Sequence, residues 1–270
     1  MLSKSAKIKS VYAELRGSMN DEKNPDEVLK FASALVENFD KKDVAPVFDP
    51  DKKLIFVDFE TSLKGDFYVV GFKIDEHFEQ IILNPDLAGL AAHHGLRMMS
   101  PTDACQYLLS ICKSDDRTIV AYGNLERDLI CDLLGLDREN SGFRYLNLHR
   151  SAKKWKSKFY QDAFTALPPL RKNAHKFLKK SQKNSLASLS RLCGLEPPSD
   201  YGPGLTSIRF KAAITSLSQK QQNYERLGRS TKAKATKALK HNKYDVLAME
   251  PMVHAISNSQ LSLLGYGIAY

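Results

Sequence analysis

Long apolar runs are absent from this 270-residue sequence, and their absence excludes a class of protein. A membrane-spanning helix needs about 18 consecutive apolar residues, and no stretch of the chain reaches that length. The first residues carry charges with no apolar segment behind them, so we expect no secretory signal. The sequence therefore predicts a protein with no membrane partner.

Cysteines are few, and none forms a Cys-x-x-Cys pair. The four are Cys105, Cys112, Cys131 and Cys193. Scattered cysteines of this kind indicate free, mostly buried thiols in a reducing compartment, which predicts a cytoplasmic protein without a zinc site. The chain also lacks a Gly-x-x-x-x-Gly-Lys phosphate loop and a Gly-x-Ser-x-Gly nucleophile turn.

Positive charge is in excess, with 40 Lys plus Arg against 31 Asp plus Glu. A net charge of +9 indicates a polyanionic partner, which nucleic acid, a membrane surface or an acidic protein would satisfy equally. The excess is concentrated between Arg150 and Lys183, where eleven basic residues accompany one acid, Asp162. Aromatic residues are interleaved there, and this composition is typical of a single-strand binding surface. The predicted nucleic-acid-binding residues are Arg150, Lys153, Lys154, Trp155, Lys156, Lys158, Arg171, Lys172, Lys176, Lys179 and Lys180.

Two regions follow from the residue pattern. Residues 1–50 read as a helical extension, a candidate surface for a protein partner. Residues 51–270 mix strand and helix patterns and predict one α/β domain, a mixed sheet flanked by helices, with a basic insertion around 150–183. The expected strands are 54–57, 67–74, 80–83 and 118–122; the expected helices are 102–113, 126–136, 186–195 and most of 211–253; residues 201–204 are expected to form a turn.

Asp58-Phe59-Glu60 directly follows the apolar run Leu54–Val57. Side chains alternate along a strand, so Asp58 and Glu60 point to the same face. Two carboxylates side by side repel each other unless a cation lies between them. The pair is therefore a candidate metal site, and solvated strand-end acids are the alternative.

A second acid lies where the strand 118–122 leads into a helix, and two residues compete for it. Counting from Glu126, positions three, four, seven and eight residues on are apolar, so Glu126 lies beside the buried stripe. Counting from Asp128, the position four residues on is Asp132, which puts Asp128 on the polar side. Helix phase therefore favours Glu126 as the inward acid.

A third feature combines His241 and Asp245, four residues apart and thus on one face of the expected helix. Asp245 is followed by apolar residues, which predicts that it is half-buried and needs a counter-charge. The alternative is a helical His–Asp pair that only stabilises the fold.

In this order the three features resemble a DEDD-type 3′–5′ exonuclease of the ribonuclease H-like superfamily. The segments Tyr122-Gly-Asn-Leu-Glu126 and His241-Asn-Lys-Tyr-Asp245 are most similar to the RecB-associated predicted nuclease branch. The resemblance covers about residues 53–255 in its order of elements. The chain departs from the pattern in having Glu at the second motif, Leu125 where an aromatic is usual, and His241 at the spacing of the tyrosine subclass.

The resemblance implies a ribonuclease H-like fold and hydrolysis of DNA or RNA, as single strands or from 3′ ends, with two Mg²⁺ or Mn²⁺ ions. It implies that Asp58 bridges both metals, that Glu60 and Asp245 complete one of them, and that Glu126 holds the other. Asp128 is the second choice for that last position.

His241 is the implied residue that orients or deprotonates the attacking water. An imidazole, with an ordinary pKa of about 6.5, suits a base at neutral pH better than a phenol of about 10, so Tyr244 is the weaker candidate. The competing hypotheses are a catalytically degenerate nucleic-acid-binding protein on the same fold and a structure-specific endonuclease.

Overall fold

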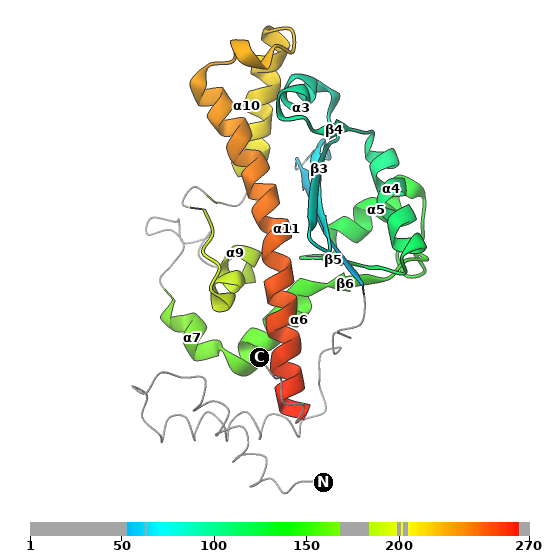
Figure 1. Cartoon of the computed structure of the whole chain (residues 1–270), viewed down its shortest axis with the longest axis vertical. Coiled ribbons are helices and arrows are strands. Elements are labelled where there is room, and N and C mark those ends of the chain that lie inside the picture. The colour runs from blue at the N-terminus through cyan, green and yellow to red at the C-terminus, as the bar shows by residue number, and fades with distance from the viewer. Residues whose placement is uncertain (1–52, 63, 168–183, 199–200, 202–204, 265–270) are drawn as a thin grey trace, which may run out of the picture.

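Six strands form one mixed sheet in the part of the chain that the structure describes (Figure 1). This computed structural model describes residues 53–62, 64–167, 184–198, 201 and 205–264. The strands are β1 (Leu54–Thr61), β2 (Phe67–Ile74), β3 (His77–Ile82), β4 (Arg97–Met98), β5 (Thr118–Ala121) and β6 (Tyr145–Asn147). They lie in the order β4-β3-β2-β1-β5-β6. Strand β2 pairs antiparallel with both β1 and β3. Strand β5 lies parallel to β1, β6 lies parallel to β5, and β4 lies parallel to β3.

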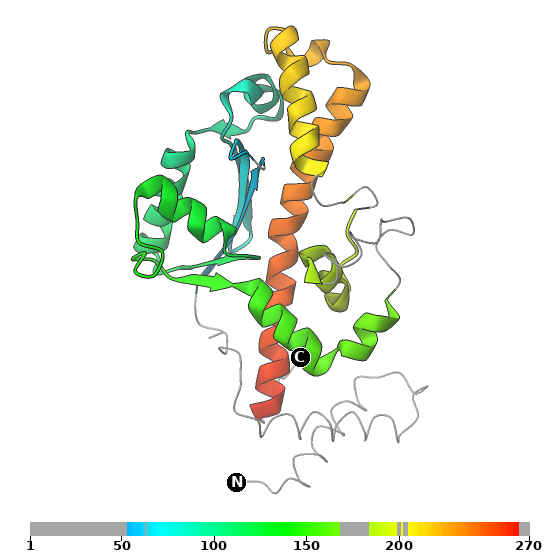
Figure 2. The same cartoon turned by 180° about the vertical axis from the view of Figure 1, so that it is seen from behind.

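Helices cover both faces of this sheet, as the two opposite views show (Figures 1 and 2). The long helix α11 crosses one face against β1 and β2, while α4 and α5 lie on the other. The helical elements are η1 (Pro85–Leu87), α3 (Ala88–His94), α4 (Pro101–Ser114), α5 (Leu125–Leu134), α6 (Leu148–Phe159), α7 (Gln161–Ala166), α9 (Leu186–Leu189), η3 (Ser190–Cys193), α10 (Leu205–Gln219), η4 (Tyr224–Arg226) and α11 (Arg229–Leu264).

Alternation along β1 decides which face its acids occupy. Ile55 and Val57 are buried in the apolar cluster that includes residues of α4 and α5. Phe56, between them, is buried in the cluster formed with α11 and α6. Since side chains alternate with period two, Asp58 and Glu60 lie on the α11 face.

Helix α10 runs beside the N-terminal half of α11, beyond the edge of the sheet (Figure 1). Their apolar residues form one cluster with η1, α3 and the start of β2. Phe210 and Ala213 of α10 and Ala235 and Ala238 of α11 are fully buried in it. This packing fixes the beginning of α10 near the end of β1.

Several predictions can be compared with these elements. The α/β class and the mixed sheet flanked by helices are confirmed. The expected strand 67–74 coincides with β2, and the expected helix 102–113 lies inside α4, capped by Ser100. The expected helix 211–253 is in fact two helices, α10 and α11, joined by a turn and η4. Elements β4, β6 and α3 were missed because two to seven residues are too few for a clear periodicity.

Parts of the predicted organisation lie outside the described residues. These are the helical extension 1–50 and residues 168–183 of the basic segment. The described part of that segment forms most of α6, followed by α7. Helix α6 packs against α11 and β5, so it belongs to the core of the domain.

The prediction of free, mostly buried thiols is confirmed, because all four cysteines are free and three of them are buried. Burial raises the pKa of the Cys105 thiol to about 12 and that of Cys112 to about 11. Among the described helices none combines the length and the apolar character required to span a membrane.

Candidate active site

Three elements bring four acids within electrostatic reach of one another near the end of β1. Asp58 and Glu60 come from the end of β1, Glu126 from the first turn of α5 and Asp245 from α11. Burial is the main cause that raises the pKa of the Asp58 carboxyl well above its usual range. The negative charges of the other three carboxylates raise it further, so all four lie within electrostatic reach of one another.

The second-motif acid that faces the cluster is Glu126. Glu126 is only 5% exposed, and burial raises the pKa of its carboxyl to about 7. The Asp128 side chain is 31% exposed and pairs with Arg127 at 3.0 Å and with Arg138 at 3.9 Å. The placement predicted from helix phase is therefore confirmed, whereas the metal role of Glu126 stays a prediction.

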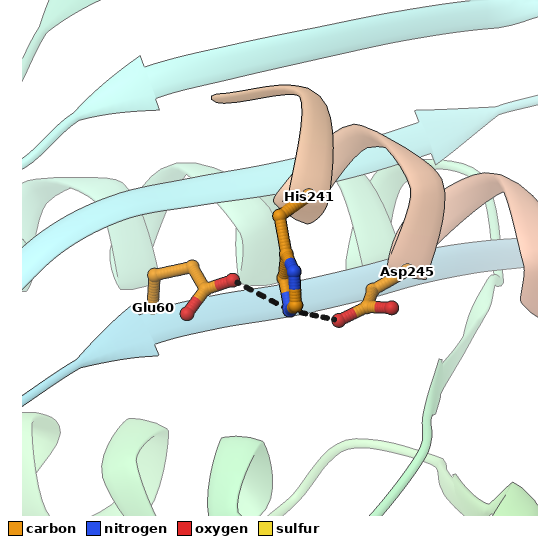
Figure 3. A group of neighbouring side chains, drawn as sticks. All are labelled: Glu60, His241 and Asp245. Carbon is orange, nitrogen blue, oxygen red and sulfur yellow. Dashed lines mark ion pairs between the residues drawn. The ribbon is translucent and has the colours of Figure 1, made fainter. Parts of the chain in front are cut away.

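His241 reaches from α11 toward Asp245 and Glu60 (Figure 3). Its Nε2 lies 3.3 Å from Asp245 Oδ2, one helical turn away, and 3.9 Å from Glu60 Oε1. The ligand atoms of these three residues all lie within 4.8 Å of one another, which is close enough to hold one metal ion. The other ring nitrogen, Nδ1, is buried with no hydrogen-bond partner among the described residues.

Tyr201 is a site residue that sequence reasoning placed in a turn. Its ring stacks on the His241 imidazole with centroids 4.1 Å apart and planes 7° from parallel. Its hydroxyl donates a hydrogen bond to Asp245 Oδ1 at 2.7 Å. An aromatic residue among Pro and Gly has no periodicity, so no pattern in the sequence indicated this contact.

Tyr244, the alternative base, is directed away from the carboxylates toward η3. Its hydroxyl lies 2.7 Å from Ser190 Oγ. Burial raises the pKa of its phenol to about 12, which makes proton transfer at neutral pH harder. The geometry therefore favours His241 over Tyr244 as the group that serves the site.

A chain of buried amides holds Asp58 in place. Asn242 Nδ2 donates to Asp58 Oδ2 at 2.8 Å and to the Asp58 carbonyl at 3.0 Å. Gln80 Nε2 donates to Asn242 Oδ1 at 2.8 Å and to the Leu239 carbonyl at 3.0 Å. Because a carbonyl only accepts, the Leu239 bond fixes the orientation of Gln80, and Gln80 in turn directs the Asn242 amino group at Asp58.

Gly71 of β2 leaves the room that this amide chain needs. A Cβ atom at that position would lie 2.2 Å from Asn242 Oδ1. Sequence reasoning identified neither Gly71 nor Gln80, because their partner lies more than 160 residues away along the chain.

The charge balance of the site favours a bound cation. Within the described ranges no lysine or arginine forms an ion pair with the four carboxylates. Thr206, at the start of α10, gives Glu60 a hydrogen bond that lowers the pKa of its carboxyl, but burial and Asp245 outweigh it and raise that pKa. Buried carboxylates without a counter-cation repel one another, and oxygen donors of this kind suit a hard divalent ion. The residues present therefore fit a Mg²⁺ or Mn²⁺ site.

The predicted basic surface needs a correction at two positions of α6. Trp155 is 3% exposed, and its Nε1 donates to Ser259 Oγ of α11, so its ring is not available to stack on a base. Lys156 is also buried, and its Nζ donates to Asn184 Oδ1 at 2.8 Å. These side chains lie on the apolar stripe of an amphipathic helix, which turns them into the core.

The other residues of that surface divide into two groups. Arg150, Lys153 and Lys154 are exposed on α6, and Lys158 is half-buried beside the ring of Phe159. The remaining ones, Arg171, Lys172, Lys176, Lys179 and Lys180, lie outside the described residues.

Comparison with known proteins adds no relative. No protein-family model, no curated protein and no solved structure matches this chain. The function is therefore argued from the residues and geometry of the site.

Proposed function

We propose that this protein is a metal-dependent 3′–5′ exonuclease of the DEDD type that hydrolyses DNA or RNA. One observation carries the proposal: acids from three motifs distant in sequence meet as a buried cluster with no lysine or arginine partner among the described residues. A cluster that serves stability alone would gain from a lysine or arginine within it, because unpaired buried charge is costly.

The architecture supports a ribonuclease H-like fold. Three antiparallel strands are extended on one side by the parallel strands β5 and β6, with helices on both faces. Asp58 and Glu60 lie at the end of β1 and Glu126 lies just beyond the parallel neighbour β5, where α/β sheets commonly place their sites.

Asp58, Glu60, Glu126 and Asp245 would hold two divalent ions. When bound, such ions polarise the phosphoryl oxygen and lower the pKa of a bound water. Asn242 keeps one Asp58 oxygen fixed by a hydrogen bond, and Tyr201 does the same for one oxygen of Asp245.

His241 supplies the proton acceptor. Its Nε2 is the ring nitrogen directed at the carboxylates, and it takes up the proton of the attacking water. The stacked Tyr201 ring restricts rotation of the imidazole, while Asp245 stabilises the imidazolium that forms.

The test is digestion of 5′-labelled single-stranded DNA and RNA with Mn²⁺. We expect wild type to shorten one or both substrates progressively from the 3′ end, Asp58→Ala to be inactive, and the matched variant Asp128→Asn to remain active. Discrete internal cuts would instead identify an endonuclease. Binding without digestion by wild type would identify the degenerate binding protein and refute the proposal.

A further inference from the structure

The N-terminal half of α11, Arg229–Lys243, has an unusual charge composition. It contains six basic residues and no acidic one, and the first acid along the helix is Asp245 of the site. Arg229, Lys234, Lys240 and Lys243 are exposed. The six basic residues together are called the α11 basic track: Arg229, Lys232, Lys234, Lys237, Lys240 and Lys243.

Elsewhere on the described surface many basic side chains are neutralised by acids. Arg97, Arg138 and Arg144 each form an ion pair with a neighbouring carboxylate. In the α11 basic track Lys232 pairs with Glu225. By contrast, Arg229, Lys234, Lys240 and Lys243 form no ion pair with any residue that the structure describes. These four side chains are therefore positive charges that no described acid neutralises.

This arrangement is unfavourable for the helix itself. Lysines three residues apart, such as Lys234 with Lys237 and Lys237 with Lys240, are neighbours on the helix surface and repel each other. Cations in the first turns also oppose the helix dipole, whose positive end is the N-terminus. Helix stability does not account for such a composition, whereas binding of a polyanion does.

The track and the site belong to one continuous helix (Figure 1). Lys234 precedes His241 by seven residues, which is close to two full turns, so both start from the same side of α11. The rise of about 1.5 Å per residue separates them by about 10 Å along the axis. Lys237 and Lys240 lie between them along the axis, and at about 100° per residue Lys237 is about 40° and Lys240 about 100° around the helix from His241, so the track winds around α11.

We propose that the phosphate backbone of the nucleic-acid substrate lies along the α11 basic track as the strand enters the carboxylate site. The inference rests on the proposed exonuclease function and names the surface that holds the substrate. An acidic cluster repels an anionic strand, and cations on the adjoining helix offset that repulsion. The contact is with phosphates, so it does not distinguish DNA from RNA.

The experiment compares two triple variants that remove the same charge. Arg229→Gln/Lys234→Gln/Lys240→Gln neutralises three residues of the track. The matched control Lys53→Gln/Lys113→Gln/Lys220→Gln neutralises three exposed lysines outside α11 and outside the predicted basic surface. Gln and Lys have similar helix propensities, so both variants should fold, which circular dichroism and thermal melting check. The probe is a 5′-fluorescent oligothymidylate of about 20 nucleotides, bound in Ca²⁺ and followed by anisotropy at several salt concentrations.

We expect the track variant to lose about 100-fold in affinity at 0.1 M salt, because each single-strand phosphate contact contributes about 0.7 to the slope of log K against log salt. That slope should fall by about 2. The control should bind as wild type does. Wild-type affinity in the track variant, or equal losses in both variants, would overturn the inference.

A second substrate separates this inference from the function on which it rests. The p-nitrophenyl ester of thymidine 5′-phosphate has one phosphodiester and no further backbone. With Mn²⁺ we expect the track variant to hydrolyse it at the wild-type rate, since none of its three substitutions lies among the site residues. If wild type binds the oligonucleotide through the track yet hydrolyses neither substrate, the exonuclease proposal is refuted, whereas the inference that the track binds the phosphate backbone is supported.

Discussion

Replacing Glu126 by glutamine removes one buried charge from the carboxylate cluster and keeps the shape of the side chain. The pKa of this carboxyl rises from its ordinary value of 4.5 to about 7, mainly because the group is buried. Each pKa unit corresponds to about 1.4 kcal/mol, so ionised Glu126 costs the metal-free fold about 3 kcal/mol. At pH 8 in EDTA we expect Glu126→Gln to be more stable than wild type by up to that amount, which is roughly 6–12 °C in melting temperature.

The pH dependence follows from the direction of the shift. Between about pH 4.5 and 7 the folded protein holds a proton on Glu126 that the unfolded chain has released, so stability falls as pH rises through this window. Below pH 4.5 the group is neutral in both states, and the advantage of Glu126→Gln should disappear. Asp58 and Glu60 also have raised pKa values, so the variant keeps part of the wild-type slope.

Thermal melting and urea denaturation between pH 4.5 and 8, with EDTA or Mn²⁺, measure these differences. Mn²⁺ should stabilise wild type more than Glu126→Gln, because a ligand that binds the folded state stabilises it in proportion to its affinity. The control Asp128→Asn changes a half-exposed acid beside Arg127 and should shift stability by less than about 0.5 kcal/mol. If Glu126→Gln is no more stable than wild type at pH 8 in EDTA, the desolvation argument is wrong.

Three further predictions follow from the contacts around the site. Gly71→Ala should weaken Mn²⁺ binding about 10–100-fold, measured by calorimetry, because the added Cβ displaces Asn242 although no metal ligand is changed. The control Gly228→Ala, which has open space around it, should leave Mn²⁺ binding unchanged. Tyr201→Phe should lower the free energy of unfolding by about 1.5–3 kcal/mol, because the hydrogen bond to Asp245 is lost. Tyr201→Leu also loses the stacking on His241 and should lower the free energy of unfolding more. Equal stability of Tyr201→Phe and wild type would contradict this prediction. Trp155→Ala should lower the free energy of unfolding by about 3–5 kcal/mol in urea denaturation, because a buried ring is removed from the core. A small effect on stability would show that the ring does not belong to the core.

Much of the fold was predictable because short-range periodicity reports local structure. The apolar run before Asp58 and the strand Phe67–Ile74 identified two central strands. Helix α6 was not identified, although Leu148, Ala152 and Trp155 lie at helical spacing behind the capping residue Asn147. Its dense positive charge suggested a surface, and charge is a weaker guide to exposure than apolar spacing.

Side-chain direction within one element was also determined by the sequence. Period two along β1 puts Asp58 and Glu60 on one face, and helical phase turns Glu126 inward and sets His241 beside Asp245. These relations span at most eight residues, a distance over which backbone geometry alone decides where side chains point.

Only the tertiary structure decided which side chains complete the site. Tyr201 reaches Asp245 across 44 residues, and the bond between Asn242 and Asp58 spans 184. The space for that bond depends on Gly71, a residue of a different strand. Such contacts depend on how helices and strands pack against one another, which no local pattern encodes. The sequence thus determined the acids and their directions, whereas packing determined the groups that hold them in place.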